Sequence, residues 1–154
     1  MRWIRLWALA GGVLLLLVMA MNVLAVVLAA FGSSFPGDFE LTEVGVAVAA
    51  FAFLPYVQLV GGNVTADIFT ERAGPRLLAL FRLLASAVAV LFSLLLLWRM
   101  FEGMLDQRAY GHVTAVLQFP IWIGFALALA SIVLWSVAAV LTLRDAIADL
   151  VKRG

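Results

Sequence analysis

The chain has 154 residues, of which 66% are hydrophobic and 12% are charged. Soluble domains carry about 45–50% apolar and about 25% charged residues, so a soluble domain of this size would leave much apolar surface in water. A soluble globular fold is therefore excluded, and the net charge of +1 gives no indication of a nucleic-acid partner. The lack of Cys excludes disulfides and thiolate sites, and the single His excludes a haem held by two histidines.

Four apolar runs predict an all-α integral membrane protein with four transmembrane helices. About 20 apolar residues cross the hydrocarbon core of a bilayer, and the expected spans cover about residues 7–31, 44–62, 77–98 and 117–143. The first run is longer than the apolar core of a signal peptide, about 7–15 residues, which favours an uncleaved anchor. We expect residues 1–154 to form a single membrane domain.

Helix-start residues mark three of these spans. Thr42 is placed as a cap for the second span and Glu43 in its first turn, where the helix dipole favours an anion. Pro75 suits the first position of the third helix, and Pro120 suits the first turn of the fourth. Pro55 lies inside the second span and is expected to bend it.

The segment between the second and third spans predicts a short amphipathic helix at the membrane interface, about residues 63–73. Its apolar residues recur at helical spacing, and its charged residues occupy the other side; these two sets are Val64, Ile68 and Phe69, and Asp67, Glu71 and Arg72. Arg82, one to two turns inside the third helix, is expected to reach back to Asp67 or Glu71.

The distribution of basic residues predicts the orientation. Eight of the ten Lys and Arg residues precede the first span, lie around the second connection or follow the fourth span: Arg2, Arg5, Arg72, Arg76, Arg82, Arg144, Lys152 and Arg153. Cytoplasmic segments of membrane proteins carry the excess of positive charge. Both termini are therefore expected in the cytoplasm, with Trp98 and Trp122 at the opposite membrane face.

The spans offer few groups for chemistry. Apart from Glu43 and Arg82 near span ends, their polar residues are Asn22, Gln58 and scattered serines. Glu102, Asp106 and His112 follow no metal-binding spacing, and no Gly-x-Ser-x-Gly motif is present. We expect no enzyme, no metal site and no cofactor. Small residues in the first two spans, such as Gly11 and Gly45, favour packing against another membrane protein.

Several short motifs, in order along residues 39–143, resemble one family. They are Glu43 opening the second helix, Gly62-Asn63-Val64-Thr65-Ala66-Asp67 after it, Pro75-Arg76 before the third helix, and Gly111-His112-Val113-Thr114-Ala115-Val116-Leu117-Gln118-Phe119-Pro120-Ile121-Trp122 opening the fourth. This chain resembles the small membrane subunit (DctQ type) of tripartite ATP-independent periplasmic (TRAP) transporters. It differs from the family pattern in having Asn63 where a histidine is frequent, and in lacking a Trp and paired acids near Glu43.

The resemblance implies a scaffold subunit in the bacterial inner membrane. Such a subunit packs beside a large membrane transport subunit, which takes up an organic acid driven by an ion gradient. A periplasmic substrate-binding protein delivers the acid, and membrane lipid surrounds the complex. The residues proposed as subunit or interface contacts are Glu43, Asn63, Asp67, Arg72, Arg82, Pro120 and Trp122.

Two other functions stay open at this point. One is a stand-alone homodimeric transporter of four-helix subunits, with Glu43 as its coupling group. The other is a membrane-anchor subunit of another complex, for which the chain has few haem ligands to offer.

Overall fold

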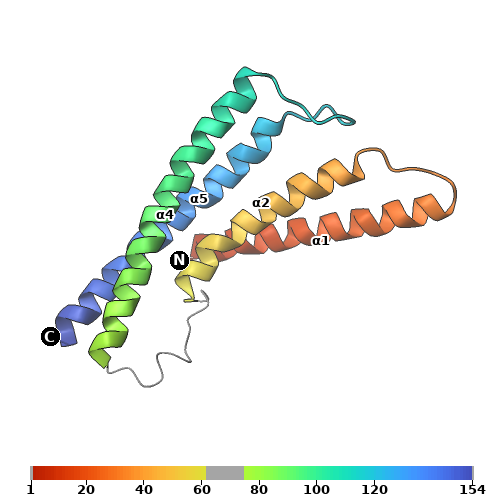
Figure 1. The fold of residues 1–154 in the computed structure, drawn as a ribbon. Coiled ribbons are helices and arrows are strands. Elements are labelled where there is room, and N and C mark those ends of the chain that lie inside the picture. Colours follow the sequence, from red (N-terminus) through yellow and green to blue (C-terminus); the bar gives the residue numbers. More distant parts are fainter. Residues whose placement is uncertain (1, 62–74, 154) are drawn as a thin grey trace.

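A computed structural model describes residues 2–61 and 75–153. Its helices are α1 (Arg2–Ala30), α2 (Asp38–Leu59), α4 (Pro75–Ala109) and α5 (Ile121–Arg153) (Figure 1). Within the described ranges the backbone forms no strand, only an isolated bridge between Val113 and Pro120. All four helices are long and apolar enough to cross a membrane, as predicted. The expected interfacial helix at residues 63–73 falls outside the described residues.

The second helix begins earlier than its apolar run. It starts at Asp38, so Asp38 and Glu40 lie in the first turn, and Gly37 is the N-cap residue. The prediction of Thr42 as a cap and of Glu43 in the first turn was therefore wrong. Acidic residues near a helix N-terminus interact favourably with its dipole, so the helix can extend over this polar stretch. It also continues through Pro55 to Leu59, and the Pro55 side chain is fully buried.

The last two helices continue well past the expected spans. At 1.5 Å per residue, the 35 residues of α4 and the 33 residues of α5 are each about 50 Å long, against roughly 30 Å of hydrocarbon. The prediction that Pro120 lies in the first turn of the fourth helix was wrong, because α5 begins at Ile121. Backbone pairing of residues 112–121 occupies the preceding loop.

Two helices end in the same way, at a glycine in the left-handed conformation. After α1, Gly32 has φ 78°, its amide bonds to the Ala29 carbonyl, and the Ser33 amide bonds to the Leu28 carbonyl. After α4, Gly111 has φ 63° and the same pattern follows. This arrangement satisfies the last helix carbonyls and needs a residue that adopts positive φ without strain. It turns the chain sharply into each loop.

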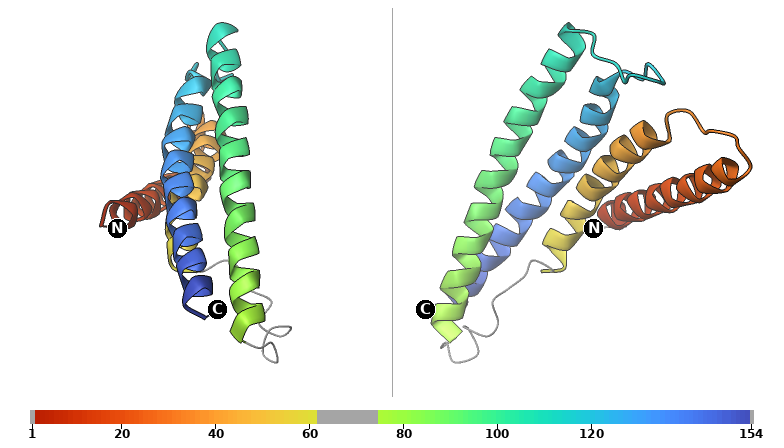
Figure 2. Two further views of the ribbon diagram at one scale, coloured as in Figure 1. Left: turned by 90° about the vertical axis from the view of Figure 1, so that its left-hand side faces the viewer. Right: turned by 45° about the vertical axis from the view of Figure 1, so that its right-hand side comes forward.

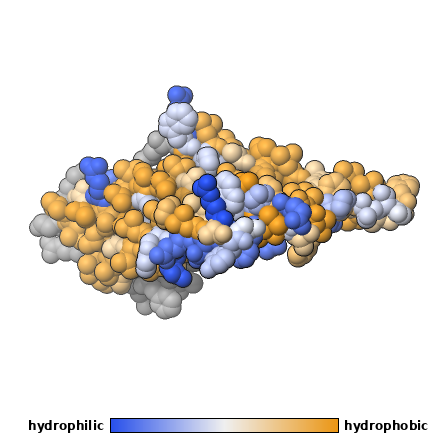
Figure 3. Space-filling model, turned by 90° about the horizontal axis from the view of Figure 1, so that it is seen from above, coloured by the Kyte–Doolittle hydropathy of each residue, from blue (hydrophilic) through white to orange (hydrophobic). Residues whose placement is uncertain are grey.

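The helices form two antiparallel hairpins joined through α2 and α5. Helix α5 packs against both α4 and α2, whereas α1 packs mainly on α2. Helices α4 and α5 run side by side, and α1 leans away from them (Figure 2). Fully buried side chains therefore gather on α5, including Ser131 and Ile132. Hydrophobic residues cover broad areas of the surface seen from above, with hydrophilic residues gathered near its middle (Figure 3).

Small residues hold α1 close to α2. A Cβ atom added to Gly11 would lie 2.8 Å from the Cβ of Ala52, and Gly45 faces the side chain of Val18. By contrast, a Cβ on Gly12 would meet nothing within 4 Å. The sequence analysis expected these small residues to pack against another membrane protein. At least Gly11 and Gly45 instead pack within this chain, between α1 and α2.

Candidate functional site

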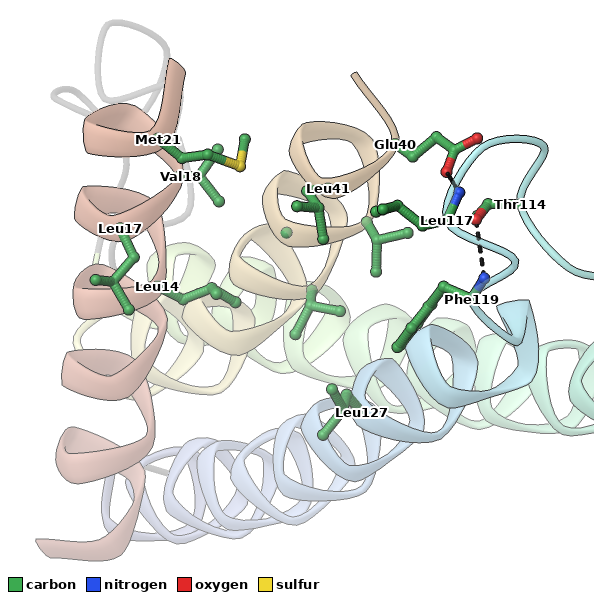
Figure 4. A pocket seen from close by; sticks show the side chains of 13 residues that line it. Leu14, Leu17, Val18, Met21, Glu40, Leu41, Thr114, Leu117, Phe119 and Leu127 are labelled. Carbon is green, nitrogen blue, oxygen red and sulfur yellow. Dashed lines mark hydrogen bonds between the residues drawn. The ribbon is translucent and has the colours of Figure 1, made fainter. Parts of the chain in front are cut away.

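The end of the bundle that carries the 31–37 and 110–120 loops is organised by Glu40. This carboxylate accepts hydrogen bonds from the backbone amides of Val116 at 2.7 Å and Leu117 at 3.0 Å. Figure 4 shows the bond from Leu117. Leu117 also packs directly on Gly37, which precedes α2. Hydrogen bonds to an ionised acceptor are stronger than those between neutral groups. Glu40 thus fastens the loop before α5 to the start of α2.

The loop itself is a small hairpin. The Thr114 amide bonds to the Phe119 carbonyl at 3.0 Å, and the Phe119 amide donates to the Thr114 hydroxyl at 3.0 Å. Gln118 has φ 54°, an unusual value for a residue other than glycine. The turn that contains Gln118 directs the backbone amides of Val116 and Leu117 toward the carboxylate of Glu40. Sequence analysis overlooked Glu40, although a carboxylate in the first turn of a helix was a usable indication.

Glu43, the predicted contact, lies elsewhere on the same helix. Its side chain is exposed, and no hydrogen bond or ion pair joins it to any other residue within the described ranges. It lies five positions after Asp38, about 7.5 Å along the helix axis. Glu40 is therefore satisfied within the chain, and Glu43 is left available to a group outside it.

An apolar groove runs between the two hairpins, next to the Glu40 contact. It encloses about 360 Å³, and α1, α2, α5 and the 114–119 loop all contribute to its walls (Figure 4). Its lining residues are Leu14, Leu17, Val18, Met21, Glu40, Leu41, Val44, Gly45, Val48, Thr114, Leu117, Phe119 and Leu127. Nearly all of them are aliphatic or aromatic.

The two amide side chains of the spans are engaged within the protein. Asn22 on α1 donates to the hydroxyl of Thr42 on α2 at 2.8 Å. Gln58 on α2 is buried, donates to the hydroxyl of Thr142 at 3.0 Å and accepts from the indole of Trp135 at 3.4 Å. These contacts join helices, so both amides have a structural use.

Trp7 adds a further bond between helices. Its indole N–H donates to the hydroxyl of Ser131 on α5 at 2.9 Å, across 124 positions of sequence. The Ser131 hydroxyl in turn donates to the carbonyl of Leu127. This bond joins α1 to α5, in addition to the packing of α1 on α2.

Pro120 and Trp122 flank the start of α5. Trp122 lies against Arg108, whose guanidinium carbon is 5.5 Å from the centre of an indole ring. This cation–π contact joins the end of α4 to the start of α5. The structure thus gives Trp122 a role within the hairpin of α4 and α5.

Arg82 lies on α4 with an exposed side chain. It lines a small hollow together with Asp149 of α5, Leu78, Ala79 and Ala146. Its predicted partners Asp67 and Glu71 lie outside the described residues, as do Asn63 and Arg72. The pairing of Arg82 with Asp67 or Glu71 stays a prediction, and Asp149 is a carboxylate close by.

Glu102, Asp106 and His112 do not form a metal-binding cluster. Within residues 2–61 and 75–153, no group of three or more potential ligands is suitably placed. Glu102 instead pairs with Arg99 at 3.1 Å. His112 Nδ1 lies 2.9 Å from the side-chain oxygen of Gln107 and its ring stacks on Tyr110. These contacts shape the end of α4 and the loop after it.

The described residues thus combine a rigid loop anchor, contacts that join helices and extensive exposed apolar surface. Residues 15–149 match the family described as tripartite ATP-independent periplasmic transporters, DctQ component. No curated protein and no solved structure shows a significant match to the chain.

Proposed function

Because this chain belongs to the DctQ family of TRAP transporters, and is thus a small subunit of a membrane transporter, we propose that it scaffolds the large membrane subunit. In this proposal the large subunit imports an organic acid, driven by an ion gradient, after a periplasmic binding protein has delivered it. The small subunit lies in the bacterial inner membrane with both termini in the cytoplasm. It holds its partner in position and leaves the solute and ion sites to that partner.

The surface area of the chain is the observation that carries this proposal. The chain exposes 10545 Å², whereas a compact monomer of 16.6 kDa exposes about 7,600 Å². The α1 and α2 hairpin diverges from α4 and α5 (Figure 1), which leaves helix faces of both hairpins uncovered. Membrane helices gain stability by packing against other helices. A partner subunit with many helices is suited to cover such an open arrangement.

We propose Glu43 as a contact to the large subunit. Its exposed carboxylate lies within a helix long and apolar enough to span the membrane. A charged group facing acyl chains is costly, so such groups usually have polar partners. A donor on the large subunit, such as an arginine or a hydroxyl group, would offset that cost. The neighbouring exposed residues Ala47 and Ala50 would allow the partner helix to approach closely.

Co-purification of the two subunits tests this contact. Glu43→Gln should weaken retention of the large subunit, because it removes a charge-assisted bond of about 1.5–3 kcal/mol, equivalent to roughly 10–150-fold in affinity. Glu102→Gln is the matched control, since Glu102 pairs with Arg99 in its own helix. Equal retention of the large subunit by the two variants would show that Glu43 does not contribute to the interface.

Reconstitution tests the scaffold role itself. The large subunit with its binding protein should transport in liposomes only when this chain is present, and this chain alone should not transport. Alanine substitutions at Asn22, Glu43 and Gln58 should alter the amount of assembled complex but not which solute is carried, because Asn22 and Gln58 are engaged within the chain. Uptake of an organic acid by this chain alone would instead favour a stand-alone transporter.

A further inference from the structure

Helices α4 and α5 pack antiparallel in a fixed register. A Cβ atom added to Gly103 on α4 would lie 3.1 Å from the ring of Phe125 on α5. Toward the other end of the pair, Arg82 and Ala146 line the same small hollow. Both contacts give the same alignment, because each step forward along α4 is a step back along α5. Positions on one helix can therefore be compared with the positions beside them on the other.

Charged side chains mark the two helices at two levels. On α4 the residues between Arg82 and Arg99 carry no charge. On α5 the first charged residue is Arg144, and the alignment places it beside Leu84. The side chains of Arg82, Arg99 and Arg144 are exposed, so they face the surroundings of the helix pair. Both helices are therefore uncharged together only along residues 85–98 of α4 and the part of α5 beside them, which we call the uncharged band.

The uncharged band is shorter than the hydrocarbon core of a typical bilayer. Residues 85–98 rise about 21 Å at 1.5 Å per residue, against roughly 30 Å of hydrocarbon. Tilting the helix pair would reduce the height of the band further. A short apolar stretch is accommodated by a thinner bilayer or by flanking side chains that reach the interface. Arginine can extend in this way, but the exposed Asp145, next to Arg144, has too short a side chain to do so.

The first helix is longer than the uncharged band and inclined to it. Residues 6–30 of α1 carry no charge and extend for about 37 Å. An apolar helix that is too long for a bilayer fits it by tilting, and α1 leans away from α4 and α5 (Figure 2). A layer as thin as the uncharged band therefore accommodates both hairpins in the arrangement that the structure has.

We propose that this chain thins the bilayer around α4 and α5 and therefore binds phospholipids with short acyl chains in preference to long ones. The acyl chains contact exposed side chains of the uncharged band, such as Val88 and Leu91, which are 62% and 70% exposed. The cost of mismatch is modest for each Å, so it selects among lipids and does not hold one lipid in a fixed site. This inference does not depend on the proposed scaffold function.

Competition between phospholipids measures this preference. The full-length chain is reconstituted into vesicles of phosphatidylcholine with myristoleoyl, oleoyl or erucoyl chains, in order of increasing length. Each vesicle also contains brominated dioleoylphosphatidylcholine, which quenches the fluorescence of the protein's tryptophans on contact. The myristoleoyl lipid should bind about threefold more strongly than the erucoyl lipid, because the cost of mismatch rises with each Å. Equal binding, or stronger binding of the erucoyl lipid, would overturn the proposal.

A double variant lengthens the uncharged band. Arg99→Leu with Glu102→Leu removes the ion pair as a whole, so neither charge is left without its partner. The next charged residue of α4 is Asp106, and the band then rises about 31 Å. The preferred lipid should change from the myristoleoyl to the oleoyl lipid. Asp106→Leu is the matched control, because Arg99 still ends the band, and its lipid preference should equal that of the wild type.

Circular dichroism of each variant in vesicles checks that its helices are folded. An unchanged lipid preference in the folded double variant would overturn the proposal, and so would an equal change of preference in Asp106→Leu. If the double variant does not fold, the preference of the wild-type chain decides the proposal by itself.

Discussion

The carboxylate of Glu40, in the first turn of α2, accepts a hydrogen bond from the amide of Leu117, 77 positions along the chain, at 3.0 Å. With the matching bond from Val116, this contact connects the two hairpins at their loop end. The hairpins also contact each other through the packing of α2 on α5 and through the bond from Gln58 to Thr142. The position of the loop before α5, and so the shape of the groove below it, depends on this carboxylate.

Replacing Glu40 should therefore loosen the loop. In Glu40→Ala the amides of Val116 and Leu117 lose their acceptor, and a bond to a charged group contributes about 1.5–3 kcal/mol. Hydrogen exchange at these two amides should accelerate by roughly 10–150-fold. Glu43→Ala, in the same helix, should leave their exchange unchanged. Unaltered exchange in Glu40→Ala would contradict the anchoring role.

Two adjacent glycines should respond differently to the same substitution. Gly11→Ala places a methyl group 2.8 Å from the Cβ of Ala52, so α1 and α2 must move apart, and overpacking of this kind costs about 1–3 kcal/mol. Gly12→Ala meets nothing within 4 Å and should be neutral or stabilise the helix by up to about 1 kcal/mol. Thermal unfolding in detergent, followed by tryptophan fluorescence, distinguishes the two. Equal midpoints would mean that α1 and α2 are not closely packed at Gly11.

The bond between Trp7 and Ser131 should show a measurable coupling energy. A double-mutant cycle with Trp7→Phe and Ser131→Ala removes the donor, the acceptor, or both. Such bonds between membrane helices average about 0.6 kcal/mol and reach about 1.7 kcal/mol, so the coupling should fall in that range. The same cycle on Trp7 with Ser93, which bonds to Val90 within α4, should give no coupling. A coupling energy of zero between Trp7 and Ser131 would mean that this bond does not join α1 to α5.

The proposed orientation can be tested because the chain has no native cysteine. A single cysteine at Tyr110 should react with an impermeant maleimide added to intact spheroplasts. One at Thr70 should react only after the membrane is permeabilised, because eight of the ten basic residues lie on that side. Ready labelling at residue 70 from outside, with none at residue 110, would invert the topology.

Much of the architecture was predictable from the order of residues alone. Four apolar runs predict the four helices because the length of a run and its lack of charge are properties of consecutive residues. Pro75 at the first position of α4 was likewise readable, since proline suits that position. The family could also be recognised, because its motifs lie in fixed order along the chain. The start of α2 was placed late, because Asp38 and Glu40 are polar yet favourable in a first turn.

The sequence by itself determined that this protein belongs to a transporter family and that the described residues include four helices long and apolar enough to cross a membrane. Only the tertiary structure decided that Glu40 binds the loop before α5 while Glu43 stays free within the described ranges. It also decided that the space where a Cβ atom of residue 11 would lie is occupied by Ala52, while the same space at Gly12 is empty. The hydropathy of a segment is a sum over consecutive residues, so the sequence of that segment is enough to predict a membrane-spanning helix. Which of two similar neighbours forms a contact depends on the rotation and crossing of helices, set by packing between segments far apart in sequence.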